Sequence, residues 1–311
     1  MQPEATAFLF PGQGSQSVGM GQELAGKFSI AKETFDQADH ILGFSITNLT
    51  WEGPPEELND TINTQPALMV HSVAALRVLQ EKFPGFKPAY VAGHSMGELS
   101  ALVAAEALGF EDALKLARRR GELMKHADVI APGGMAAILG LNIPELDDIC
   151  AQASTEEEIV QVANDNCPGQ VVISGNKQAL ERAMAGATAA GAKRVVSLPI
   201  SIAAHSPLMA HAQADFNKAV DAAPIQDPAV PLIGNVTAAP LTTAREIRAD
   251  LQAQLRSRIR WTETIQYLLA QGVDTFIEIG NGDVLCGLGK RIDRKSQRLA
   301  LGKPEDFNNL P

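Results

Sequence analysis

The sequence is poor in cysteine and in long apolar runs, and each shortage excludes a class of protein. Its 311 residues contain three cysteines, an odd number without C-x-x-C spacing, so neither a disulfide framework nor a metal site of the zinc type is expected. No apolar stretch approaches the roughly 18 residues of a membrane span. No basic residue precedes the short N-terminal apolar run, as one would in a signal peptide. We therefore expect a reduced, cytoplasmic protein with no membrane partner.

Basic charge is also scarce. Lys and Arg number 26 against 36 Asp and Glu, which gives a net charge of −10, whereas non-specific nucleic-acid binders are usually basic. We therefore expect no nucleic-acid partner. Apolar residues make up 45% of the chain and charged residues 20%, a globular composition that excludes intrinsic disorder. The length suits one large domain or two moderate ones.

Short apolar runs alternate with helical patterns in the first part of the chain. Residues 5–10 and 89–92 are typical of buried strands, and each is followed within a short distance by a predicted helix, at 22–28 and 98–108. A further helix is predicted over 65–83, where apolar side chains recur at helical spacing. This alternation indicates an α/β protein with a mostly parallel sheet that is covered on both faces.

The pattern changes at Pro132-Gly133-Gly134. Between residues 132 and 199 the predicted order is strand, helix, strand, strand, helix, strand, which is the ferredoxin-like βαββαβ pattern. We expect this segment to form a small inserted domain, with residues 1–131 and 200–311 forming the large one. The second part of the large domain is predicted to contain helices at 207–222, 244–255 and 262–270 and strands at 230–235 and 275–278.

The strongest chemical signal is Gly93-His94-Ser95-Met96-Gly97. It matches G-x-S-x-G between a predicted strand and a predicted helix, the context that a nucleophile elbow requires. There the glycines permit a sharp turn that exposes Ser95 Oγ, and the backbone N–H of Met96 can stabilise an oxyanion. The alternative is an ordinary strand-to-helix turn with a capping serine; the flanking elements favour the catalytic interpretation.

A serine nucleophile needs a base, and the chain has six histidines. His94 adjoins Ser95, but neighbouring side chains in a tight elbow point apart. His205 lies in an irregular segment before a helix and follows the serine in chain order, so it is favoured over a simple loop histidine. No acidic residue presents itself as a third member, and a backbone carbonyl could orient the imidazole instead. Three further histidines fall within predicted helical stretches, where a histidine is by default a surface or core residue. They are His40, His71 and His126.

Arg120 is the third signal. On the predicted helix 111–127 its neighbours at helical spacing are apolar, whereas Arg118 neighbours Lys115 and Glu122. An inward arginine is costly unless it meets an anion, and its guanidinium fits a carboxylate in bidentate fashion. A bound carboxylate and a structural ion pair are both open. The apolar neighbours are Ala113, Leu116, Ala117, Leu123 and Met124.

The loop Gly12-Gln13-Gly14-Ser15-Gln16-Ser17 follows the first predicted strand. A dinucleotide-binding fingerprint would need a third glycine where Ser17 stands, so an NAD-dependent enzyme is disfavoured. The glycines instead allow a backbone N–H to approach a second reactive group and complete an oxyanion hole.

These pieces together resemble the malonyl-CoA:acyl carrier protein transacylases of bacterial fatty-acid synthesis. The resemblance runs from Phe10 to about Arg291, across nearly the whole chain. So many motifs in the same order argue strongly against a similarity by chance. They are Phe10-Pro11-Gly12-Gln13-Gly14-Ser15-Gln16, Gln65-Pro66-Ala67, Gly93-His94-Ser95-Met96-Gly97-Glu98, Arg120-Gly121-x-Leu123-Met124, Asn166-x-Pro168-Gly169-Gln170-Val171-Val172, His205-Ser206-Pro207-Leu208-Met209, and Gln254-Leu255 ahead of Arg260-Trp261.

The resemblance implies a large α/β-hydrolase-like domain with a small ferredoxin-like insertion. It implies that Ser95 takes the malonyl group from malonyl-CoA, that His205 is its base, and that the phosphopantetheine thiol of acyl carrier protein then attacks the ester in a ping-pong mechanism. Arg120 matches the arginine that binds the malonyl carboxylate. The backbone carbonyl of Gln254 would hold the imidazole of His205. Gln254 is also assigned, together with Arg120, to the substrate-binding residues. Gln13 and Met96 match the oxyanion hole. No cofactor or metal is implied, malonyl-CoA being a substrate, and a monomer is expected.

Two rival functions stay open. One is a related serine acyltransferase, either the discrete acyltransferase of a polyketide synthase or the malonyl transferase of malonate decarboxylase. The other is a non-catalytic carrier-protein-binding or scaffold protein with a degenerate site, against which the intact set of site residues argues. Since both substrates are anionic, one of three basic runs is predicted to dock the carrier protein, although each could be a simple solvated face. They are Lys193 with Arg194, Arg256 with Arg258 and Arg260, and Lys290, Arg291, Arg294, Lys295 and Arg298.

Overall fold

The computed structural model describes residues 2–308. Its larger sheet has six strands, and every neighbouring pair is parallel except β7 with β8. The mostly parallel sheet expected from the sequence is therefore confirmed. In spatial order the strands are β10 (Gln297–Leu301), β9 (Thr275–Ile279), β1 (Thr6–Phe10), β2 (Tyr90–Gly93), β7 (Leu232–Ile233) and β8 (Pro240–Leu241).

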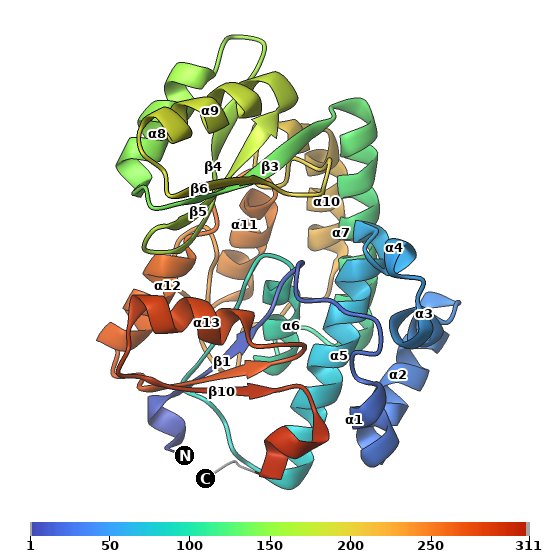
Figure 1. Ribbon diagram of the computed structural model, residues 1–311. Coiled ribbons are helices and arrows are strands. Elements are labelled where there is room, and N and C mark those ends of the chain that lie inside the picture. Colours follow the sequence, from blue (N-terminus) through green and yellow to red (C-terminus); the bar gives the residue numbers. More distant parts are fainter. Residues whose placement is uncertain (1, 309–311) are drawn as a thin grey trace.

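Helices cover both faces of this sheet, as Figure 1 shows. Alternate residues of β1 belong to different apolar clusters, because successive side chains of a strand point to opposite faces. Phe8 and Phe10 join the cluster that α5 (Thr61–Lys82), α6 (Gly97–Ala104) and α7 (Phe110–Ile130) build. Ala7 and Leu9 join the cluster of α12 (Trp261–Ala270) and α13 (Val284–Ile292). The remaining helices of the large part are η1 (Pro3–Ala5), α1 (Gln22–Lys27), α2 (Ser29–Leu42), α3 (Ile46–Glu52), α4 (Pro55–Leu58), η2 (Pro207–Met209), α10 (Ala210–Ala222), α11 (Ala244–Gln254) and η3 (Pro304–Asn308).

The second sheet has four strands, and all its pairs are antiparallel. Its strands are joined in the predicted βαββαβ order, which confirms the ferredoxin-like fold, and α8 and α9 pack together on one face (Figure 1). The opposite face turns several side chains toward the site described below. The elements are β3 (Gly133–Leu139), α8 (Ile143–Ala153), β4 (Val160–Cys167), β5 (Gln170–Asn176), α9 (Lys177–Ala189) and β6 (Arg194–Ser197).

Helix α5 begins four residues earlier than predicted. Asp60 caps it, accepting a hydrogen bond from the backbone N–H of Ile62 at 3.2 Å. Pro66 lies within the helix and has no N–H to donate to the carbonyl of Ile62. Arg118 of α7 donates to that carbonyl at 3.3 Å instead, so the proline is accommodated without an unpaired oxygen.

The helix predicted over 98–108 is wrong at its C-terminal end, since α6 stops at Ala104. Glu106 adopts φ = 58°, the left-handed conformation that ends many helices, and the N–H of Ala107 returns to the carbonyl of Leu102. Gly109, which follows the predicted helix, is the N-cap residue of α7. The strand predicted over 230–235 is also shorter, being confined to Leu232–Ile233.

Several elements were not predicted at all, among them α2, α3, α4, α13 and β10. The sequence signal for helix α2 was present, because its buried residues Ala31, Phe35 and Ala38 recur at helical spacing. Within residues 2–308, none of the helices combines the length and apolarity needed to cross a bilayer.

A buried histidine of α5 is expected to make the stability of the fold depend on pH. His71 of α5 is 1% exposed, and its ring Nε2 lies 2.9 Å from the carbonyl oxygen of Gly302. Burial lowers the pKa of His71 from 6.5 to about 4. Between pH 6.5 and 4 the imidazole of His71 therefore binds a proton in the unfolded chain but not in the folded one. The free energy of unfolding falls as the pH falls through this range.

We expect His71→Gln, which can still donate to Gly302, to weaken this dependence. From pH 7.5 to pH 5 the wild type should lose about 2 kcal/mol more unfolding free energy than the variant. Urea denaturation of both proteins at the two pH values measures the difference. Equal losses in the two proteins would show that His71 does not carry the effect.

Candidate active site

Ser95 stands at the junction between β2 and α6 with φ = 53°. Its two flanking glycines are required by close contacts. A Cβ atom on Gly93 would lie 2.0 Å from the backbone carbon of Gly97, and one on Gly97 would lie 2.2 Å from the carbonyl oxygen of Phe10. No larger residue fits at either position, so the G-x-S-x-G pattern follows from the geometry of a nucleophile elbow.

Asn235, just beyond β7, holds the elbow in place through two hydrogen bonds. Its side-chain oxygen accepts the N–H of Ser95 at 2.8 Å, and its amide nitrogen donates to the carbonyl of Gly93 at 2.7 Å. These two bonds lie on either side of His94 and hold the backbone that leads into the strained Ser95. The result is that Oγ faces the space between the two sheets.

His205 lies where a general base is needed. Its Nε2 is 2.8 Å from Ser95 Oγ, and its Nδ1 is 2.9 Å from the backbone carbonyl oxygen of Gln254. A carbonyl only accepts, so Nδ1 carries the proton and Nε2 is free to take one from the serine. Burial, assisted by the positive charge of Arg120, lowers the pKa of His205 to about 3. The imidazole is thus neutral at physiological pH, as a base must be.

Arg120 of α7 is 2% exposed and reaches the same point. Its guanidinium donates to Ser95 Oγ at 3.2 Å, to Gln254 Oε1 at 2.8 Å and to Gln65 Oε1 at 3.0 Å. Burial lowers its pKa to about 10, so it remains charged at neutral pH. Two neutral amides therefore hold a cation beside the nucleophile, and its direct hydrogen-bond partners include no carboxylate among the described residues.

The loop after β1 packs against the elbow. A Cβ atom on Gly12 would lie 2.4 Å from the carbonyl oxygen of His94, which shows how closely the two backbones approach. The side chain of Gln13 is anchored by Thr61, whose hydroxyl donates to Gln13 Oε1 at 2.6 Å. The backbone N–H groups of Gln13 and Met96 have no hydrogen-bond acceptor within residues 2–308. Both remain available for an oxygen of a bound substrate.

A cavity of about 580 Å³ joins these groups. Its walls come from the loop after β1, from the elbow and α7, and from the uncovered face of the small sheet. His94 also lines it, but His94 Nε2 is 2.8 Å from Asn166 Oδ1 of β4, so this ring is engaged away from the serine. The candidate residues that line the cavity are Gln13, His94, Ser95, Arg120 and His205. The volume suits a small acyl group with a slender arm behind it.

Sequence reasoning missed several residues that organise this site. Gln65 and Asn166 belong to the motifs that carry the resemblance, but no role was assigned to them. Asn235 was predicted only as the last residue of a strand. The side chain of Gln254 also does more than expected, because it bonds Arg120 while its own amide donates to the backbone oxygen of Ser95 at 3.1 Å. The only available signal was the presence of amide side chains next to catalytic motifs, which by itself is weak.

Known proteins resemble this chain both in sequence and in structure. Residues 7–292 match the family model described as "Acyl transferase domain". The malonyl CoA-acyl carrier protein transacylase of Bacillus subtilis is 46% identical over 299 residues, covering 96% of this chain and 94% of the relative. That of Salmonella typhimurium is 47% identical over 298 residues, covering 96% of each.

Solved structures agree. An acyl carrier protein S-malonyltransferase from Vibrio cholerae superposes with a TM-score of 0.94 at 42% identity, covering 98% of this chain and 99% of that one. A malonyl-transacylase solved in complex with its type II PKS acyl-carrier protein gives a TM-score of 0.94 at 41% identity, covering 97% of each chain. With the site geometry above, these likenesses lead to one conclusion: this chain belongs to the acyl transferase domain family.

Proposed function

We propose that this enzyme transfers the malonyl group of malonyl-CoA to the phosphopantetheine thiol of acyl carrier protein through a malonyl-Ser95 ester. One observation carries the proposal: Ser95 Oγ lies 2.8 Å from the neutral base His205 and 3.2 Å from the buried cation Arg120. A nucleophile and a carboxylate-binding group therefore meet at one atom. The names of the relatives support malonyl as the acyl group and acyl carrier protein as the acceptor.

In the first half-reaction His205 Nε2 takes the proton of Ser95 Oγ as this oxygen attacks the thioester carbonyl. The resulting oxyanion accepts hydrogen bonds from the N–H groups of Gln13 and Met96, which have no competing acceptor in the described part of the chain. The intermediate then collapses, the carbon–sulfur bond breaks, and the departing thiolate of coenzyme A takes the proton from His205. Arg120 holds the free carboxylate of the malonyl group throughout.

The second half-reaction runs the same steps in reverse. His205 removes the proton of the phosphopantetheine thiol, the sulfur attacks the ester carbonyl, and Ser95 leaves with the proton returned by His205. The same oxyanion hole serves both steps. Ping-pong kinetics are expected because coenzyme A leaves before the second thiol attacks the malonyl-Ser95 ester.

Intact-protein mass spectrometry tests the proposal without any substitution. After brief incubation with malonyl-CoA, the wild type should gain one malonyl group and release coenzyme A. Addition of phosphopantetheinylated acyl carrier protein should then discharge the adduct onto the carrier. An enzyme that forms no adduct and releases no coenzyme A would favour the scaffold function. Rapid loss of the adduct to water without carrier protein would favour hydrolysis over transfer.

Fatty-acid and polyketide carriers share the phosphopantetheine arm, and one structural relative is bound to a polyketide carrier. We propose fatty-acid synthesis as the pathway, since the sequence relatives are the transacylases named above. A panel of carrier proteins compared by kcat/KM distinguishes the two.

We further propose that residues 132–199 form the inserted domain and that 1–131 with 200–311 form the catalytic one. The separate apolar cluster beneath α8 and α9 supports this division. We also propose a monomer in the cytoplasm: the site residues all come from one chain, and Cys150, Cys167 and Cys286 are free thiols. Light scattering measures the oligomeric state.

Among the basic runs, we propose that the end of α13 docks the carrier protein. Arg291 there donates to Gln170, a residue that lines the cavity, so this helix end lies beside the active-site opening. Lys290 is exposed and forms no ion pair among the described residues. In contrast, Arg258 and Arg260 are paired with Asp147 and Glu263.

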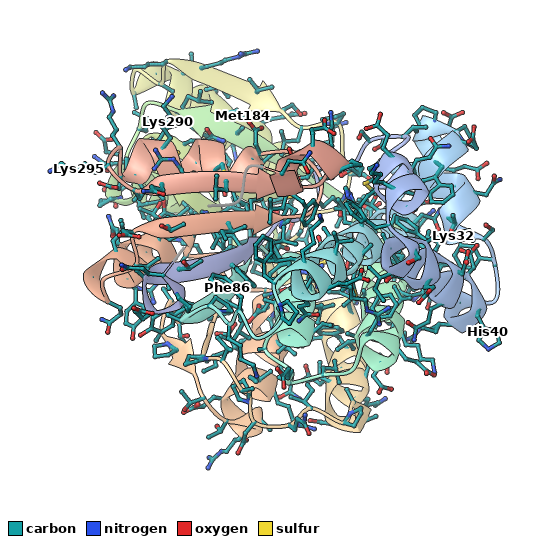
Figure 2. All side chains as sticks on the ribbon, turned by 90° about the horizontal axis from the view of Figure 1, so that it is seen from below. Lys32, His40, Phe86, Met184, Lys290 and Lys295 are labelled. Atoms are coloured by element: carbon teal, nitrogen blue, oxygen red, sulfur yellow. The ribbon has the colours of Figure 1, made fainter. Side chains whose placement is uncertain are left out.

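Lys290→Glu is expected to raise the KM for carrier protein about threefold to tenfold and to leave the KM for malonyl-CoA unchanged. Lys32→Glu is the control, because Figure 2 shows Lys32 and Lys290 on opposite sides of the molecule. Steady-state kinetics with both substrates varied measure the effect. A wild-type KM for carrier protein in the Lys290 variant would remove this patch from consideration.

A further inference from the structure

Two carboxyl side chains meet beneath the nucleophile elbow, where none of the reaction steps above uses them. Glu98 lies in the first turn of α6 and is 0% exposed, and Asp250 of α11 is 3% exposed. The two carboxyl groups are close enough for each to influence the pKa of the other. Two carboxylates cannot both be ionised in contact inside a protein, so the pair must share a proton.

The donors around the pair decide where that proton resides. Asp250 accepts backbone N–H groups of Asn235 at 3.0 Å and of Val236 and Thr237 at 3.3 Å, which is the environment of an ionised carboxylate. Glu98 has far fewer donors. Its Oε2 accepts only from Gln254, and its buried Oε1 has no donor in the described chain.

An oxygen without a donor that faces a carboxylate is explained if it carries the proton itself. Burial raises the pKa of Glu98 well above its ordinary value, and the charge of Asp250 raises it further. The charged groups that face Glu98 are Asp250 from α11 and Arg120 from α7, and Arg120 acts in the opposite direction but more weakly. Geometry and electrostatics thus favour the same proton position.

We propose that Glu98 is a positioning residue that keeps its proton at neutral pH, donates it to Asp250 through Oε1 and accepts from Gln254 through Oε2. The inference deepens the proposed function and rests on it for its kinetic consequence. Its effect is transmitted through the amide of Gln254, which it holds in one of two possible orientations.

The orientation of Gln254 matters because that residue contacts both functional side chains. With Nε2 directed to Glu98 and to the backbone oxygen of Ser95, Oε1 faces the guanidinium of Arg120 at 2.8 Å. The reversed amide would present N–H groups to a cation. The backbone carbonyl of Gln254 also holds His205. Glu98 therefore helps to fix the carboxylate-binding group.

Because Glu98 and Asp250 share one proton, the pair brings only one negative charge to the active site. Arg120 carries one positive charge and the acid pair one negative charge. A second ionised carboxylate in this apolar region would oppose the arrival of the malonyl carboxylate. Glutamic acid at position 98 thus supplies a donor and an acceptor without adding a charge.

Infrared spectroscopy and kinetics of two variants test the proposal. The wild type at pH 7.5 should show the carbonyl stretching band of a buried protonated carboxylic acid that Glu98→Gln lacks; the difference spectrum of the two proteins removes the contribution of buried Glu278, whose pKa burial raises to about 7. Glutamine supplies an equivalent neutral donor and acceptor, so we expect Glu98→Gln to keep malonyl kcat/KM within about threefold. Glu98→Leu removes both bonds and should lower malonyl kcat/KM about tenfold to a hundredfold, with a smaller effect on acetyl-CoA. Glu106→Gln is the control, being the same substitution at a side chain 57% exposed.

Absence of the band in the wild type would overturn the protonated state. A Glu98→Gln variant as impaired as Glu98→Leu would overturn it too, because the charge itself would then be needed. Full activity of Glu98→Leu would overturn the positioning role. If Glu98→Leu does not fold, the infrared band and the kinetics of Glu98→Gln still test whether Glu98 is protonated. The band is independent of acyl transfer, so failure of the proposed function, seen as a missing malonyl adduct on the wild type, is distinguishable.

Discussion

Ser95→Ala is expected to lower malonyl transfer by a factor of about 10⁴ or more and to abolish the malonyl adduct. Both His205 and Arg120 contact this hydroxyl, at 2.8 and 3.2 Å, so its loss removes the acyl acceptor and leaves the base with nothing to activate. The methyl group of alanine fits wherever the Cβ of serine fits. Single-turnover mass spectrometry with malonyl-CoA measures both adduct and coenzyme A release.

Ser100→Ala is the matched control for this experiment. Ser100 lies on α6, five residues beyond the nucleophile, and its buried Oγ has no hydrogen-bond partner in the described chain. Removing it should leave transfer unchanged and should not destabilise the protein, because an unsatisfied hydroxyl is removed. An adduct of undiminished yield on Ser95→Ala would contradict the proposed nucleophile.

Arg120→Met is expected to change which acyl group the enzyme accepts. Losing one partner of a buried charge pair costs about 2–5 kcal/mol, so malonyl kcat/KM should fall about a hundredfold or more. Acetyl-CoA has no carboxylate for Arg120 to bind, and its kcat/KM should change less than about tenfold. The ratio of malonyl to acetyl transfer, measured with both donors in competition, reports the carboxylate contact alone.

Arg119→Met serves as the control on the same helix. Its side chain is 48% exposed and pairs with Glu122 at 3.5 Å, so its loss should not change the acyl-group ratio. If Arg120→Met lowers malonyl and acetyl transfer equally, the arginine orients the serine or supports the fold, and malonyl selectivity has another origin.

The sequence was most informative where a short segment determines its own geometry. The elbow could be predicted because its five-residue pattern lies between a predicted strand and a predicted helix. Gly93 is required by a contact within the elbow itself, with the backbone of Gly97, although Gly97 is required by the more distant carbonyl of Phe10. The βαββαβ order of the small sheet was readable because each of its elements has strong periodicity and lies next to its neighbour in the chain. His205 was found by elimination, and its position beside Ser95 agrees with that expectation.

Contacts between distant parts of the chain could not be predicted. Asn235 bonds a residue 140 positions away, and Gln254 bonds one 156 positions away. Nothing local to either amide indicates such a partner. Glu98 looked like an ordinary acidic residue in the first turn of a helix, where it would stabilise the dipole. Only the approach of α11 gives it a second carboxyl and therefore a proton.

The backbone of the two reacting residues has a further consequence. Ser95 and His205 both adopt left-handed conformations, with φ of 53° and 57°, although neither is a glycine. Each such residue costs about 1–2 kcal/mol relative to a relaxed backbone. The folded chain thus keeps strain at both ends of its shortest catalytic contact, maintained by Asn235 on one side and Gln254 on the other. Selection for thermal stability alone would relax these two residues and separate Oγ from Nε2, so stability and activity are opposed at this site.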